Sequence, residues 1–119
     1  MSTFTKNHLS GSTDGRMIKV AATATAGTTI HTGPSDTAVF HEVWLWAANS
    51  DTAWRKLTIE YGSTSAPDDL IEVYLPPEDG LKLIVPGLVI QGNATPLVVR
   101  AFASSANVVM IAGYVNEIS

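Results

Sequence analysis

Three histidines are the first residues to consider for chemistry, because the 119-residue chain contains no cysteine. A zinc site needs three or four convergent ligands, which here would have to be histidines and carboxylates. His8, His31 and His41 are scattered along the chain, and only His31 and His41 are spaced to approach each other across strands. We interpret them as histidines on a strand face or at an interface, and no metal centre is expected.

The acidic residues give no calcium-binding pattern. They cluster as Asp68-Asp69 with Glu72, and as Glu78-Asp79. Neither cluster has the alternating ligand spacing or the closing glutamate of a calcium loop. Solvated charges at turns are the better interpretation, and no cofactor is predicted.

Catalytic patterns are also missing. Glu42 and Glu60 could form a glycosidase pair only with a sugar cleft and one carboxyl group in an apolar setting, and the sequence shows neither. The chain has many serines and threonines but no nucleophile-elbow pattern, and its glycines follow turns rather than opening a helix. We therefore expect a protein that is not an enzyme.

The composition narrows the classes of partner. The net charge of −4 argues against a nucleic-acid-binding protein, which needs a basic surface to neutralise phosphates. No window approaches the about 20 apolar residues of a membrane span, and the first twenty residues lack the apolar core of a signal peptide. Charged residues make up only 15% of the chain and hydrophobic ones 45%, so we expect part of the surface to be covered by partners or by copies of the chain.

The elements that position these side chains are short β-strands. Turn signals recur about every 8 to 12 residues, and no segment carries a helical apolar stripe. The sequence predicts a single antiparallel β-sandwich of about eight strands, with a jelly roll as one topology, over residues 16–119. Residues 1–15, rich in Ser, Thr, Gly and Asn, are predicted to form a flexible N-terminal arm that could order against a neighbour.

Two β-hairpins are predicted. The first spans 39–62 and holds all three tryptophans, with its turn at 49–51. Its second arm alternates, with Leu57, Ile59 and Tyr61 on one face and polar residues on the other. The second hairpin joins strands 97–103 and 107–115. Between the hairpins, 81–85 and 88–91 are predicted as two strands separated by a turn at Pro86-Gly87.

The first arm of the tryptophan hairpin is apolar on both faces, so we expect one of Trp44 and Trp46 to lie in the core. Trp54 falls on a polar face, where an exposed aromatic is typical of protein interfaces. A register slip of one residue would instead place any such strand wholly within the sandwich. The predicted interface residues are Phe4, Trp46, Trp54, Tyr74, Phe102 and Tyr114.

Several segments together resemble a known class of protein. The run VWLWAANSDTAWRKLTIEYG is followed by a Pro-Asp-Asp turn, by PPEDGLKLIVPGL, and by VRAFASSANVVMIAGYVN. Over residues 38–118 this is similar to small β-rich virion structural proteins of tailed bacteriophages. The resemblance implies a head decoration (cement) protein, made in the host cytoplasm and bound to the major capsid protein on the outside of the virion, often as a homotrimer. For such a role we expect the N-terminal arm and the exposed aromatics, Trp54 first, to make the contacts with the capsid and with other subunits. The resemblance also allows a neck, tail or fibre-base component.

A carbohydrate-binding module is the competing interpretation, because β-sandwiches with surface tryptophans often stack on sugar rings. This alternative predicts that Trp54 is exposed beside a polar cleft.

Overall fold

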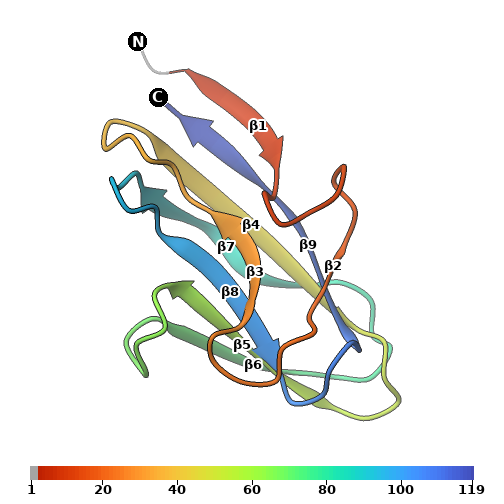
Figure 1. The fold of residues 1–119 in the computed structure, drawn as a ribbon. Helices are drawn as coiled ribbons and strands as arrows, with labels where there is room; N and C mark the ends of the chain where they lie inside the picture. Colours follow the sequence, from red (N-terminus) through yellow and green to blue (C-terminus); the bar gives the residue numbers. More distant parts are fainter. Residues whose placement is uncertain (1–2) are drawn as a thin grey trace.

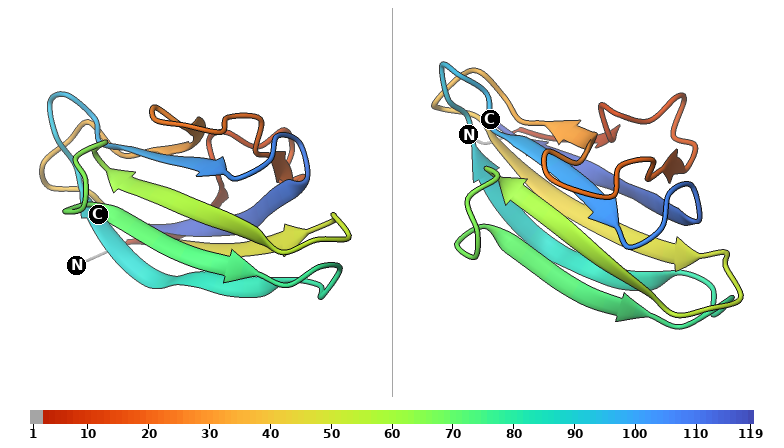
Figure 2. Two further views of the ribbon diagram at one scale, coloured as in Figure 1. Left: turned by 90° about the horizontal axis from the view of Figure 1, so that it is seen from below. Right: turned by 60° about the horizontal axis from the view of Figure 1, so that its bottom comes forward.

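The computed structural model describes residues 3–119 and shows nine strands in two antiparallel sheets. The sheets pack face to face as a β-sandwich, which confirms the predicted fold class (Figure 1, Figure 2). Sheet A contains β1 (Phe4–His8), β2 (Ile18–Lys19), β4 (Phe40–Asn49), β7 (Lys82–Gln91) and β9 (Val109–Ile118). Sheet B contains β3 (Thr28–Thr32), β5 (Arg55–Gly62), β6 (Leu70–Leu75) and β8 (Val98–Ala103). Within residues 3–119 there is no helix that could cross a membrane.

The strand order is β1-β9-β4-β7 in sheet A, with β2 also paired to β9, and β3-β8-β5-β6 in sheet B. From β3 onward the chain changes sheet at every connection except the one between β5 and β6. This is the connectivity of a jelly roll. The first and last residues of the described part, Thr3 and Ser119, lie side by side and exchange two backbone hydrogen bonds.

The predicted tryptophan hairpin is wrong in its pairing. Its two arms are β4 and β5, but β4 pairs with β7 and β9, whereas β5 pairs with β6 and β8. The connection between them crosses from one sheet to the other, and the Asn49 amide holds it by donating to the carbonyls of Ala53 at 2.9 Å and Leu75 at 3.1 Å. A period of two shows that a strand has one buried face, but it does not show whether the next strand lies beside it or across the core.

The other two predictions about strand pairing are corrected in the same way. β8 lies in sheet B and β9 in sheet A, so the chain from 97 to 115 is a second crossing between the sheets and not a hairpin. β7 runs unbroken from Lys82 to Gln91 through Pro86 and Gly87, and its register against β4 shifts once at Gly87 and once at Ile84. Pro86 is tolerated because β7 is an edge strand of sheet A.

The core is the layer of side chains between the two sheets. Burial along β4 alternates at every residue, with Val43, Leu45 and Ala47 fully buried. The facing row of sheet B includes Leu57 and Ile59. The remaining buried apolar residues are Leu9, Ile18, Val20, Ile30, Leu75, Val85, Ile90, Val99, Ala101, Ala103, Val109, Ile111 and Val115.

Part of the N-terminal segment that was predicted as an arm is paired within the chain. β1 pairs with β9 over its full length, so 4–8 form an edge of sheet A within the single chain. The connection that follows is tied to sheet B, because Leu9 is buried and Gly11 donates its N–H to the carbonyl of Ile30 at 2.9 Å. Residues 1–2 of the predicted arm lie outside the described part of the chain.

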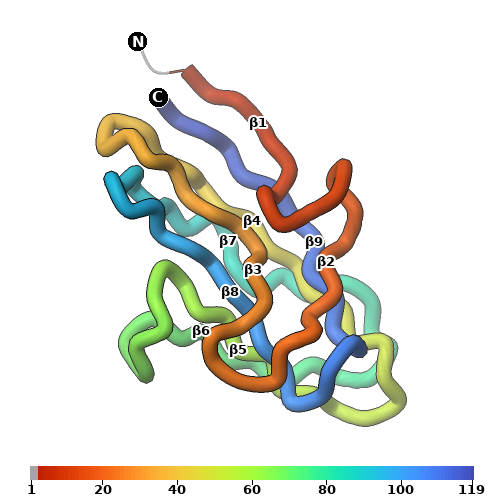
Figure 3. The backbone as a smooth tube through the Cα atoms, in the orientation of Figure 1, coloured from red at the N-terminus to blue at the C-terminus, as the bar shows by residue number. Residues whose placement is uncertain are grey.

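A loop covers part of the outer face of sheet B. The segment between β2 and β3 passes in front of β8, as Figure 3 shows, and Ala22 accepts a hydrogen bond from Ala103. Glu60 lies beneath this loop, where its carboxylate accepts hydrogen bonds from Thr25 Oγ1 at 2.5 Å and from the N–H of Gly27 at 2.7 Å. The polar row predicted on β5 is therefore buried at Thr58 and Glu60.

Candidate functional site

Three aromatic side chains form a cluster on the outer face of sheet A. Trp44 and Trp46 come from β4, and Tyr114 comes from the paired position on β9. The three ring centroids lie 6.0–6.3 Å apart, and the ring planes are 18–29° from parallel. All three are half-buried, so the expectation that one of Trp44 and Trp46 belongs to the core is wrong. The buried positions of β4 are the odd-numbered ones, which places both tryptophans on the opposite face.

Two glycines lie against Trp44, one against its backbone and one against its indole. A Cβ at Gly113 would lie 2.0 Å from the carbonyl oxygen of Trp44, and a Cβ at Gly87 would lie 2.8 Å from Cζ2 of its indole. The ammonium of Lys6, on β1, lies 4.6 Å from the centroid of Tyr114, a cation–π contact. The cluster is therefore bounded by β7 on one side and by β1 on the other.

Glu42 supplies a negative charge beside the cluster. Its Oε1 accepts hydrogen bonds from Nε1 of Trp44 at 2.6 Å and from Nδ2 of Asn116 at 3.0 Å. The Trp44 hydrogen bond and then the Asn116 hydrogen bond lower the pKa of the Glu42 carboxyl group, because both donors favour its charged form. The carboxylate thereby fixes the indole and keeps its own charge at neutral pH.

Exposed apolar side chains extend the cluster across the whole sheet. Directly paired residues share a face, so the register places Phe4 in one row with Ile118 and Phe40. Phe4 on β1 is 70% exposed, and on β7 Leu83 and Val89 are 50% and 54% exposed. Together with the half-buried aromatic cluster, these residues define what we term the sheet A face: Phe4, Phe40, Trp44, Trp46, Leu83, Val89, Tyr114 and Ile118.

The outer face of sheet B carries a shallow polar groove. It has a volume of about 190 Å³ and is lined by Thr23, Lys56, Thr58, Glu72, Phe102, Ala103 and Ser104. Lys56 and Glu72 form an ion pair across it at 3.1 Å. Two exposed aromatics stand near it: Tyr74, 66% exposed, is paired with Lys56, and Trp54, 61% exposed, lies two residues before Lys56. We call this set the sheet B groove.

The six residues predicted for an interface therefore divide between two surfaces. Phe4, Trp46 and Tyr114 belong to the sheet A face. Of the other three residues, Phe102 lines the sheet B groove and Tyr74 is paired with Lys56, which also lines it. Trp54 is exposed and lies two residues before Lys56. The sequence analysis did not predict the other five residues of the sheet A face: Phe40, Trp44, Leu83, Val89 and Ile118. For the two residues of β7, no sequence signal marked the strand as an edge, because its position follows only from the crossings between the sheets.

The candidate catalytic pair does not form. Glu42 lies on the outer face of sheet A, whereas Glu60 is buried under the loop outside sheet B, so the two carboxylates are on opposite sides of the sandwich. His31 and His41 do meet, as the sequence suggested, with Nε2 of His31 2.8 Å from Nδ1 of His41. No group of three or more potential ligand side chains able to hold a metal ion is found among the residues that the structure describes.

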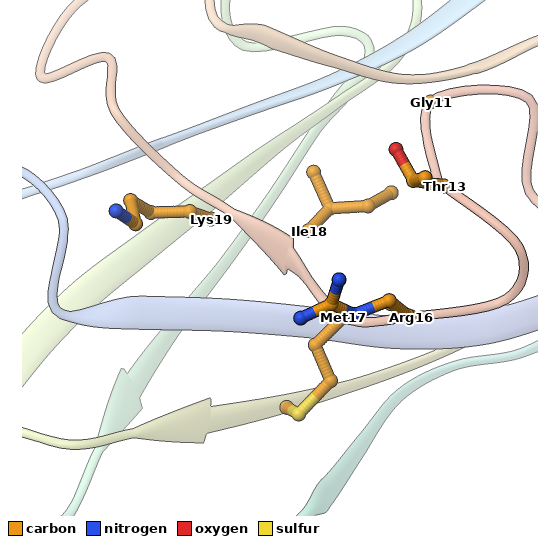
Figure 4. Close-up of a pocket in the computed structure, with 6 residues that line it drawn as sticks. All are labelled: Gly11, Thr13, Arg16, Met17, Ile18 and Lys19. Carbon is orange, nitrogen blue, oxygen red and sulfur yellow. The ribbon is translucent and has the colours of Figure 1, made fainter.

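A larger but more open hollow lies beside β2. It has a volume of about 680 Å³ and is lined by Gly11, Thr13, Arg16, Met17, Ile18 and Lys19 (Figure 4). The side chain of Lys19 extends away from the Arg16 guanidinium, and both residues are exposed. Their donor groups do not converge, so this hollow is not arranged to bind an anion.

Comparison of the chain with protein-family models, with curated proteins and with solved structures gave no match in any of the three. Function is therefore inferred from the two surfaces and from their chemistry.

Proposed function

We propose that this protein is a structural virion protein that binds the outer surface of a tailed-phage capsid as a decoration protein. In this proposal its main partners are the major capsid protein and further copies of the chain, assembled as a trimer, and its role is to stabilise the head without catalysis. The resemblance of residues 38–118 to such proteins suggests the class. A jelly-roll sandwich is compatible with the role but does not decide it, because the same architecture occurs in viral capsid proteins and in lectins.

The observation that carries the proposal is the sheet A face. It joins exposed apolar residues on both edge strands, Phe4 on β1 and Val89 on β7, through the aromatic cluster between them. Large apolar patches on the surface of a chain mark contacts with other proteins. On a capsid, many identical copies would multiply such contacts through a high effective concentration.

The test combines mass measurement with capsid binding. We expect the purified protein to be a trimer in solution and to bind expanded capsids that lack it. Val89→Glu places a charge on the sheet A face and should abolish trimer formation or capsid binding. Tyr74→Glu is the matched control, because Tyr74 is similarly exposed but lies on the opposite sheet. Full assembly and full capsid occupancy by the Val89→Glu protein would overturn the proposal.

Neck, tail and fibre-base proteins are the nearest alternative within the same class. They would use the same sheet A face on a different structural partner. Binding to purified tails or connectors, in place of capsids, by the same pair of variants separates these locations.

A carbohydrate-binding role is the second candidate, and the sheet B groove favours it. Trp54 is exposed, as this alternative requires, and a groove with hydroxyl, ammonium and carboxylate groups lies two residues further along the strand. Aromatic faces bind the apolar faces of sugar rings, while polar groups of this kind bond to sugar hydroxyls. A glycan array probed with the wild-type protein and with Trp54→Ala tests it: binding that depends on Trp54 supports a lectin-like function, and binding to no glycan removes this candidate.

A further inference from the structure

A chain of hydrogen bonds crosses the interior of the sandwich from one sheet to the other. His31 belongs to β3 of sheet B and His41 to β4 of sheet A, and both are buried, with exposures of 3% and 8%. Nε2 of His31 lies 2.8 Å from Nδ1 of His41, and Nε2 of His41 lies 3.1 Å from Oε1 of Glu117 on β9. At the other end, the backbone N–H of Ser10 donates to Nδ1 of His31 at 3.0 Å.

The groups at the two ends of this series of hydrogen bonds, Ser10 and Glu117, fix the position of every ring proton. The Ser10 N–H can only donate, so Nδ1 of His31 must accept and its proton must sit on Nε2. That proton is donated to Nδ1 of His41, which leaves the His41 proton on Nε2, where it is donated to the Glu117 carboxylate. All the hydrogen bonds therefore run in one direction, from Ser10 to Glu117, with both imidazoles neutral.

One additional proton on either imidazole cannot be accommodated. If it sits on Nδ1 of His31, this nitrogen faces the Ser10 N–H, and two donors point at each other. If Nδ1 of His31 stays unprotonated and keeps its bond from Ser10, the added proton must sit on Nδ1 of His41. That nitrogen already accepts the Nε2–H of His31, so two donors would again face each other. Every placement turns one of the hydrogen bonds into a contact between two donors, and a buried polar group without its partner is costly.

His31 has little around it to compensate a positive charge on its own ring. Within the strand ladders, His31 is paired with Val99 of β8, His41 with Ile90 of β7 and with Glu117, and Glu117 with Thr5 of β1. Glu117 is the titratable group among these neighbours, and it lies at the opposite end of the hydrogen-bond series from His31. Burial first, and the neighbouring His41 second, lower the pKa of His31 from 6.5 to about 4.

We propose that Ser10, His31, His41 and Glu117 form an acid-sensitive lock that joins the two sheets and holds the connection after β1 in place. At neutral pH the hydrogen bonds from Ser10 to His31, from His31 to His41 and from His41 to Glu117 are all formed. In acid the added proton breaks either the bond between the sheets or the bond to Ser10. Ser10 also accepts, through its Oγ, the N–H of Thr32 at 2.7 Å, so loss of its other bond loosens the attachment of the N-terminal strand to sheet B. This inference goes beyond the proposed virion function and does not depend on it.

The direction of the pH effect follows from linkage. The unfolded chain binds a proton at His31 near pH 6.5, whereas the folded chain does so only near pH 4. The stabilisation is therefore fully present above pH 6.5 and is lost as the pH falls toward 4. Over that interval the equilibrium constant for unfolding should rise by about two orders of magnitude on account of this one group.

The decisive variant is His31→Gln with His41→Gln in the same chain. Each glutamine can accept through its amide oxygen and donate through its amide nitrogen, so the one-way order from Ser10 to Glu117 is retained without a titratable ring. We expect urea unfolding of the wild type to show the loss of stability between pH 6.5 and about 4, and the double variant to show a nearly flat profile over the same range. His8→Gln, which changes the exposed histidine outside the lock, should keep the wild-type profile.

Two further measurements on the wild-type protein keep the proposal testable if the double variant does not fold. Nitrogen NMR of the imidazole rings at neutral pH should show both His31 and His41 protonated on Nε2. Hydrogen exchange, corrected for its intrinsic pH dependence, should show the amides of Ser10 and of β1 losing protection in acid before those of β4 and β5. A ring of either residue protonated on Nδ1, or an acid-induced loss of stability that persists in the double variant and disappears in Glu117→Gln, would overturn the proposal.

Discussion

The indole of Trp44 lies so close to Gly87 that any side chain at position 87 would collide with it. A Cβ there would come within 2.8 Å of Cζ2 and 3.0 Å of Cε2 of Trp44, and Gly87 has a φ of +78°. The glycine thus does two things for the sheet A face: it allows the left-handed backbone within β7, and it lets the tryptophan lie against that strand.

Gly87→Ala should consequently destabilise the protein by about 2–5 kcal/mol, the sum of about 1–2 kcal/mol for the left-handed backbone and about 1–3 kcal/mol for overpacking. Gly80→Ala is the matched control, because Gly80 has a similar φ of +71° but a Cβ at position 80 would have no atom within 4 Å. Urea unfolding should show the Gly80 variant losing only the backbone contribution. Equal losses in the two variants would mean that the contact with Trp44 is relieved at no cost.

Glu60→Ala removes the buried carboxylate that holds the loop over sheet B. The Thr25 and Gly27 donors then lose their acceptor, so we expect a loss of about 1–3 kcal/mol and faster proteolysis within residues 22–27. Glu72→Ala on the neighbouring strand removes an exposed carboxylate paired with Lys56 and should cost less than about 1 kcal/mol. If the two variants are equally stable and the loop stays resistant to protease, the carboxylate of Glu60 does not anchor it.

The tryptophans of the two surfaces should differ in their effect on folding. Trp44→Ala removes a half-buried ring in contact with Trp46, Tyr114 and Gly87 and should cost about 2 kcal/mol, less than the about 3–5 kcal/mol of a core tryptophan. Trp54→Ala should change the free energy of unfolding by less than about 0.5 kcal/mol, because the side chain is largely exposed. Thermal unfolding of both variants measures this; a large loss from Trp54→Ala would show that it packs in the fold rather than being free for binding.

A double-mutant cycle on His31 and His41 measures the hydrogen bond between the sheets. Above pH 6.5, where His31 is neutral in the folded protein, His31→Leu and His41→Leu should each cost about 1–3 kcal/mol, because each leaves the other ring with an unsatisfied nitrogen. The double variant should cost less than the sum of the two, with a coupling energy of about 0.5–3 kcal/mol. Simple additivity would show that the two rings contribute independently.

The sequence by itself determined the all-β class, the position of most strands and their buried rows. The alternation in β5 identified Leu57 and Ile59 as core, and they are fully buried. The suggestion that His31 and His41 approach each other is also confirmed, since each occupies an inward position of its strand. These features depend on local periodicity, which the residue order carries directly.

Only the tertiary structure decided which strands are neighbours. β4 and β5 face each other across the core rather than pairing, and this single fact moves Trp44 and Trp46 to one outer face and Trp54 to the other side of the sandwich. The tertiary structure also brings Glu117 into contact with His41, because β9 lies between β1 and β4 in sheet A. Strand pairing is set by contacts between residues far apart in the chain, and a period of two is the same whether the partner lies beside a strand or opposite to it.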